Sequence, residues 1–192
     1  MGSHLQAVES FHLQFARLLC AGPDKDCFAI KGGCNLRFFF ESVRYSEEIE
    51  FSRRSTTEEA VLEPIAPSVV AEHQSMQFLA PHYPLGAALR QKVKALADRR
   101  VVQARDVFDL GGVLIPRTGG RVDLLGPVRA DIQAAMERAM TLSYADYKAQ
   151  VVSYLQPEQA GAHGSPEAWD ALQTQVVEYL DKALASAGGV EP

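Results

Sequence analysis

The sequence predicts an α/β fold with a helical C-terminal part, and three features predict it. Residues 27–30 form a short apolar run, and residues 47–52 alternate between charged and apolar side chains, as half-buried strands do. Helical periodicity precedes, separates and follows these segments. The chain has 192 residues, of which 47% are hydrophobic, so it can bury one sizeable core with a small helical appendage.

Composition narrows the class of protein. A net charge of -5 argues against coating nucleic acid by charge alone, although a local basic groove stays compatible with it. No stretch approaches the roughly 20 apolar residues of a membrane span, and the start lacks a signal-peptide pattern. We therefore expect a cytoplasmic protein without a membrane partner. Cys20, Cys27 and Cys34 lack zinc-knuckle spacing, which favours buried reduced thiols.

The N-terminal elements follow in order. Residues 1–4 have the composition of a vector remnant, and apolar residues at helical spacing predict a helix over 5–21. The apolar run at 27–30 predicts a strand, which ends at a glycine turn. Residues 35–40 then resume a helix-compatible pattern. The predicted local unit is strand, glycine turn, helix.

Beyond the alternating strand, charges, threonines and two prolines predict that residues 53–67 are mostly loop. Helices are expected over 85–100 and 104–114. The second should bury four apolar side chains, Val107, Phe108, Leu110 and Leu114. Further helices are expected over 128–141, 143–155 and 166–187, the last capped by Ser165. The predicted organisation is a remnant, a core, a glycine- and proline-rich linker, a helical region and a frayed tail, at 1–4, 5–114, 115–128, 129–187 and 188–192.

Gly32 and Gly33 stand between the predicted strand and helix. Glycine lets backbone N–H groups turn toward a phosphate, and the start of a helix carries partial positive charge. A double glycine at the end of a strand is more often only a turn. The phosphate hypothesis therefore needs further support.

Glu48 and Glu50 supply that support. Two residues apart on a predicted strand, they should point their carboxylates to the same face. Carboxylates and triphosphate oxygens together hold the magnesium ion of nucleotidyl transfer. The competing interpretation is a solvated strand face with alternating acids.

Charged residues also mark the two helices that follow. Lys92 can neutralise a triphosphate as a point charge and Arg105 as a fork, while Asp106 can act as a metal ligand or a base. Taken singly, each is more simply explained as a surface charge. An exposed Asp106 predicts that Asp106→Ala abolishes activity but changes stability by only about 0.5 kcal/mol.

Together these segments resemble the AbiEii/AbiGii toxin family of nucleotidyltransferases. That family carries a Lys-Gly-Gly turn, an Arg-x-Ser-Glu-Asp-x-Asp strand and a later lysine followed by Arg-Asp-x-x-Asp-Leu. The matching segments here are KGGCNLR at 31–37, RYSEEIE at 44–50, and Lys92 followed by ARDVFDL at 104–110. The resemblance spans roughly residues 11–114.

The resemblance implies a nucleotidyltransferase fold, with a small mixed sheet flanked by helices. It also implies a nucleoside triphosphate donor with Mg²⁺, an RNA acceptor such as the 3′ end of tRNA, and an antitoxin partner. The nucleotide would be bound by Lys31, Gly32, Gly33, Ser46 and Arg105. Glu48 and Glu50 would bind metal, and catalysis would fall to Glu48, Glu50, Lys92 and Asp106.

Two departures from the family pattern matter. Glutamates stand at 48 and 50 where the family has aspartates, which moves each carboxylate by roughly 1.5 Å. Alternatively, residues 49–54 correspond to a later strand of some relatives, and the metal-binding strand is missing. On that register, the protein would be a catalytically silent domain that binds a nucleotide or a protein.

The remaining unusual residues predict packing rather than chemistry. Apart from His4 in the predicted remnant, the histidines have no ligand spacing; they are His12, His73, His82 and His163. We expect them to be surface or packing side chains. Trp169 recurs with Leu172, Val176 and Leu180 at helical spacing, which favours a core position over a stacking platform.

Overall fold

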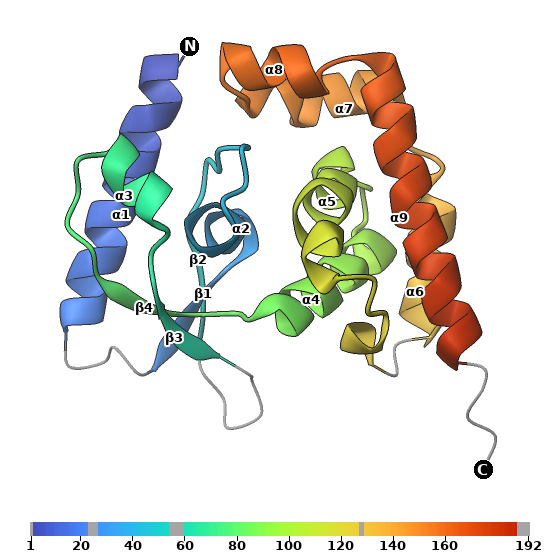
Figure 1. Cartoon of the computed structure of the whole chain (residues 1–192), viewed down its shortest axis with the longest axis horizontal. Coiled ribbons are helices and arrows are strands. Elements are labelled where there is room, and N and C mark those ends of the chain that lie inside the picture. Colours follow the sequence, from blue (N-terminus) through green and yellow to red (C-terminus); the bar gives the residue numbers. More distant parts are fainter. Residues whose placement is uncertain (1, 23–26, 54–59, 127–128, 188–192) are drawn as a thin grey trace. The chain divides into compact units, whose positions relative to one another are not determined.

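The computed structural model describes residues 2–22, 27–53, 60–126 and 129–187. The chain divides into two compact units, residues 1–84 and residues 85–192, which are treated separately below (Figure 1). The first contains a four-stranded mixed sheet with flanking helices, and the second is mostly helical. The predicted α/β class with a helical C-terminal part is confirmed.

The sheet of the first unit has the strand order β2-β1-β4-β3. Its strands are β1 (Phe28–Lys31), β2 (Glu50–Arg53), β3 (Val61–Pro64) and β4 (Leu79–His82). β1 pairs antiparallel with β2 and parallel with β4, and β3 closes the sheet antiparallel to β4. Strand β1 therefore lies inside the sheet, between β2 and β4, and its last residue leads into the glycine turn.

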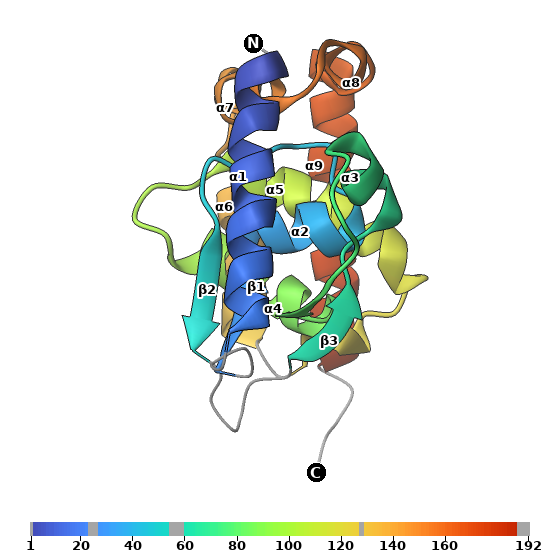
Figure 2. The ribbon, with the colours of Figure 1, turned by 90° about the vertical axis from the view of Figure 1, so that its left-hand side faces the viewer.

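Three helices complete this unit: α1 (Gly2–Ala21), α2 (Gly32–Phe40) and α3 (Pro67–Glu72). In Figure 2, α1 runs roughly parallel to β2. The helices and strands share one hydrophobic core, made of Leu13, Ala16, Ile30, Cys34, Phe38, Ile65, Ala66, Val69 and Ala80. α3 starts with Pro67 because proline lacks the N–H group that the first turn of a helix leaves unpaired.

The second unit is built from helical segments. These are α4 (Leu85–Asp98), α5 (Ala104–Phe108), a π-helix η1 (Asp109–Leu114), 3-10 turns η2 (Ile115–Thr118), η3 (Asp123–Leu125) and η4 (Val152–Tyr154), α6 (Arg129–Ala139), α7 (Tyr144–Gln150), α8 (Pro157–His163) and α9 (Pro166–Ala187). Trp169 is buried and stacks on Tyr147 with ring centroids 4.8 Å apart. Its predicted core position is confirmed.

Gly111 explains how η1 approaches α9. A Cβ atom at Gly111 would lie 2.9 Å from side-chain atoms of both Leu172 and Val176 on α9. Carbon atoms do not approach so closely, so any larger residue at 111 would require Leu172 and Val176 to shift.

Most predicted helices are confirmed. The four apolar side chains expected to be buried after residue 104 are buried, and Ser165 accepts a hydrogen bond from the backbone of Ala168 at the start of α9. The strands β3 and β4 and the helices α3 and α8 were not predicted. Strand β3 lies within residues 53–67, which were expected to be mostly loop. The predicted frayed tail at 188–192 and part of the 53–67 loop lie outside the described residues.

Domain limits and cysteines differ from the sequence prediction. The compact units meet between Pro84 and Leu85, and the described part of the predicted linker forms η2 and η3 within the second unit. Residues 2–4, predicted to be a remnant, begin α1. Cys34 is buried, but Cys20 is half-buried and Cys27 exposed, so the expectation of three buried thiols is wrong for Cys27. In the residues described here, no helix has the length and apolar character needed to span a bilayer.

Candidate functional site

The glycine turn lies where β1 passes into α2. Lys31 ends β1 and is the register partner of Glu50 on β2, and Lys31 Nζ lies 3.8 Å from Glu50 Oε2. Gly32 has a φ of 66°, in the left-handed region that favours glycine. A Cβ atom at Gly32 would lie 3.1 Å from the Glu50 carboxylate. Strand pairing thus places an acidic side chain directly against the turn.

Gly33 is packed against Ser46. A Cβ atom at Gly33 would lie 2.5 Å from Ser46 Oγ, so a larger residue cannot occupy this position unless Ser46 moves. Both glycines therefore have a structural reason to be glycine that requires no phosphate. The structure brings together Lys31, Gly32, Gly33, Ser46 and Glu50, which the sequence assigned to one site.

Glu48 does not lie on the strand, which corrects the predicted geometry. β2 begins at Glu50, and the carbonyl oxygen of Glu48 accepts hydrogen bonds from Ser46 Oγ at 2.9 Å and Cys34 Sγ at 3.3 Å. These two bonds occupy the Glu48 carbonyl oxygen, which makes no strand pairing. The side chains of Glu48 and Glu50 are both exposed. Because Glu48 lies outside the strand, strand alternation does not make the two carboxylates point to the same face.

The acidic residues at the turn have the chemistry that Mg²⁺ requires. This ion usually binds proteins through one or two carboxylates and fills its other positions with phosphate oxygens and water. Glu50 is partly solvent-exposed, next to a turn whose glycine leaves no Cβ between its backbone and that carboxylate. The donor set therefore fits a magnesium ion that is shared with a bound phosphate.

In the second unit, Lys92 joins two acidic side chains. Lys92 Nζ lies 3.0 Å from Asp106 Oδ1 and 2.7 Å from Asp109 Oδ2. Both aspartates have 0% relative exposure, and Lys92 has 6%. Arg99 Nε also lies 2.9 Å from Asp106 Oδ2, but without the geometry of a hydrogen bond. We call these four residues the Lys92 cluster.

Burial of Asp106 corrects the expectation that it is exposed. Helix α5 turns Asp106 inward while the neighbouring Arg105 stays half-buried. Removing Asp106 would leave Lys92 and Arg99 with one carboxylate fewer, so Asp106→Ala must cost more than the small change expected for a surface residue. The catalytic role of Asp106 and Lys92 and the nucleotide-binding role of Arg105 stay predictions.

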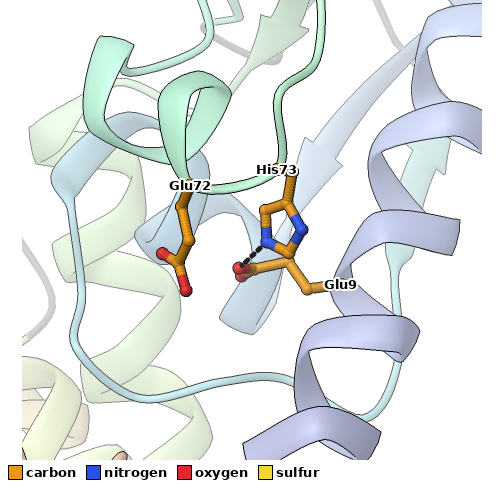
Figure 3. Close-up of side chains that lie close together, drawn as sticks. All are labelled: Glu9, Glu72 and His73. Carbon is orange, nitrogen blue, oxygen red and sulfur yellow. Dashed lines mark hydrogen bonds and ion pairs between the residues drawn. The ribbon is translucent and has the colours of Figure 1, made fainter.

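A second buried ionic network, in the first unit, was not predicted. Arg37 on α2 donates from Nε to Glu9 Oε1 at 2.7 Å and from Nη2 to Glu9 Oε2 at 3.0 Å. It also donates to Glu72 at the end of α3, and Tyr45 Oη donates to the other oxygen of Glu72. His73 Nε2 lies 2.7 Å from Glu9 Oε2 (Figure 3). We call these five residues the Arg37 cluster.

Ligand atoms of Glu9, Glu72 and His73 lie within 4.8 Å of one another, as the ligands of a metal ion do. A cation is disfavoured there because the guanidinium of Arg37 already bonds both carboxylates, and two like charges at this separation repel. The Arg37 cluster is therefore better explained as a charge network. Arg37 lies in the first family-like motif, but no sequence spacing links positions 9, 37, 72 and 73.

Two pKa shifts describe the electrostatics of the Arg37 cluster. Burial opposes ionisation of Glu72, but the hydrogen bond from Tyr45 and the charge of Arg37 outweigh it and lower the pKa of Glu72. Burial also opposes the charge of Arg37, yet the hydrogen bond to Glu9 and the two carboxylates raise the pKa of Arg37 above its usual value. Glu72 and Arg37 thus carry opposite charges at neutral pH.

Comparisons of the chain with family models, curated proteins and solved structures found no match in any of the three. The family resemblance therefore rests on the three motifs alone.

Proposed function

We propose that the chain is a nucleotidyltransferase-type toxin that binds a nucleoside triphosphate with Mg²⁺ at the turn of residues 31–33. It would transfer the nucleotide to a hydroxyl of an RNA such as tRNA, in the cytoplasm, and be restrained by an antitoxin protein. The pairing of β1 with β2 supports this most directly, because it sets Glu50 against Gly32. The three motifs of the sequence support it independently.

Each residue at the turn has a proposed task. Gly32 lets the backbone approach phosphate oxygens, and Lys31 adds a positive charge beside them. The hydroxyl of Ser46 would bind a phosphate oxygen, and Glu48 and Glu50 would hold the metal. When bound, Mg²⁺ supplies charge neutralisation and alignment of the attacking hydroxyl. Lys31 Nζ lies 3.8 Å from Glu50 Oε2, and it would pair with a phosphate instead when the nucleotide binds.

The test is transfer of a labelled nucleotide to total tRNA, with each of the four triphosphates and Mg²⁺. Glu50→Gln should lower the transfer rate by about a hundredfold or more, since it removes a ligand that positions the reacting groups. It should change stability by less than about 1 kcal/mol, because Glu50 makes only an exposed ion pair. Glu158→Gln, an exposed acid on α8, is the matched control and should transfer normally.

A second candidate function is a catalytically silent domain that binds a nucleotide or a protein. The Lys92 cluster favours it, because Lys92 and Asp106 are buried and pair with each other. For this candidate, we expect saturable triphosphate binding that Lys31→Gln weakens, without transfer to RNA. If the native chain neither binds a triphosphate nor transfers a nucleotide, the transferase function and the nucleotide-binding form of the second function are both wrong.

A further inference from the structure

A cavity of about 260 Å³ opens in the first unit between α1 and the turn that follows α3. Its lining combines three apolar side chains, which include Leu18 and Met76, with six polar ones, which include Arg17 and His73. Two of the lining residues, Arg17 and His73, can carry positive charge, and none is acidic. In a chain with a net charge of -5, this composition favours an anionic ligand.

Arg17 is available to such a ligand. Its side chain is half-buried on α1, and it has no hydrogen bond or ion pair to any residue that the structure describes. Arginine is well suited to oxyanions because its planar fork binds two oxygens at once.

His73 connects the cavity to the Arg37 cluster. Its side chain is only 6% exposed. Glu9 holds one edge of the imidazole ring by accepting a hydrogen bond from Nε2. Figure 3 shows the other ring nitrogen on the side of the ring opposite both carboxylates. Within the described ranges, Nδ1 of His73 has no partner.

The contact with Glu9 sets how the ring can meet a ligand. With Nε2 directed at Glu9, an oxyanion at Nδ1 would accept a hydrogen bond when that nitrogen carries a proton, and the oxyanion itself favours this form of the ring. The turn also holds Gln74 at a φ of 47°, a conformation that non-glycine residues adopt at a cost and that is enriched at ligand sites.

We propose that this cavity binds a small organic oxyanion, a carboxylate or a phosphate monoester, through Arg17 and His73. The oxyanion lies between the guanidinium and Nδ1, and the apolar part of the ligand packs on Leu18 and Met76. The volume lies below the range of about 300–1,000 Å³ typical of drug-sized ligands, which favours a small ligand over a nucleoside triphosphate. This site is separate from the glycine turn and does not depend on the proposed transfer.

The test is titration of the native chain with inorganic phosphate and, separately, with butyrate. Binding is followed by calorimetry and by the ¹⁵N shifts of the His73 ring. We expect a saturable response to at least one of the two, and the responding probe identifies the head group. Arg17→Gln should weaken that binding about tenfold or more, because it removes a charge-assisted hydrogen bond. Arg53→Gln, an exposed arginine on β2, is the control and should bind as the native chain does.

His73→Gln refines the assignment, since a glutamine amide can replace Nε2 toward Glu9 but offers nothing in place of Nδ1. It should lose binding to a similar extent while the chain still unfolds cooperatively. The proposal is overturned if neither probe saturates at millimolar concentration, or if Arg17→Gln binds as tightly as Arg53→Gln. Phosphate binding that survives Arg17→Gln but disappears with Lys31→Gln belongs to the glycine turn and likewise overturns it.

Discussion

Each of the two units places one cationic side chain between two carboxylates, but the carboxylates of the two units differ in exposure. In the Lys92 cluster, one lysine lies between two aspartates that have no exposure to solvent. In the Arg37 cluster, one arginine lies between Glu9, which is buried, and Glu72, whose side chain is 30% exposed. Both carboxylates of the first cluster are closed to water, although its Arg99 is 36% exposed, whereas the second cluster exposes one of its carboxylates. We call the first cluster closed and the second open in this sense.

This difference teaches which cluster can respond to its surroundings. Buried charges are costly when a partner is lost, so a closed cluster contributes mainly to stability. An exposed carboxylate in an open cluster can exchange protons with water. His73 also extends the Arg37 cluster to the cavity beside α1. Substitutions in the two clusters should therefore differ both in size and in their dependence on pH.

The largest effect is expected for Lys92→Met. It leaves Asp106 and Asp109 buried without their lysine, and breaking a buried pair in this way costs about 3–5 kcal/mol. Lys94→Met on the same helix is the matched control, because Lys94 is 64% exposed and pairs with the exposed Asp98. It should cost less than about 1 kcal/mol. Urea unfolding measures both, and similar midpoints would mean that the Lys92 cluster is not closed.

Arg37→Gln should have an intermediate effect. It removes the bidentate pair with Glu9 and the bond to Glu72, but His73 still bonds Glu9, and Glu72 can turn to water. We expect a loss of about 2–3 kcal/mol in urea unfolding, with Arg53→Gln as a control that unfolds as the native chain does. A loss larger than that of Lys92→Met would contradict the distinction between open and closed clusters.

The sequence predicts the long helices well because their apolar residues recur with a helical period. It predicts the sheet less completely. Strand β4 contains a proline and a histidine, and β3 has exposed side chains and ends at Pro64, so neither shows apolar alternation. They become strands by pairing with each other, and β4 also pairs with β1, which is a property of the tertiary structure.

The candidate site was predictable where its residues are close in sequence. The turn at 31–33 and Glu50 are brought together by one antiparallel pairing, which sequence order suggests. The Arg37 cluster joins α1, α2 and α3, and the cavity joins α1 to the turn after α3. Their residues are distant in sequence and individually ordinary, so His73 was expected to be a packing or surface side chain.

The smallest effect concerns pH. The pKa of Glu72 lies below its ordinary value of 4.5, so its contribution to stability is complete above that value. The contribution is lost as pH falls through the lowered pKa of the folded state. Between about pH 5 and pH 3, the native chain should therefore lose more stability than Glu72→Gln, which has no carboxyl group to protonate. Urea unfolding across this range measures the slopes, with Glu158→Gln as an exposed control. Equal slopes for Glu72→Gln and the native chain would show that Glu72 is ionised as easily in the unfolded chain, and that the open end of the Arg37 cluster stores no charge-dependent stability.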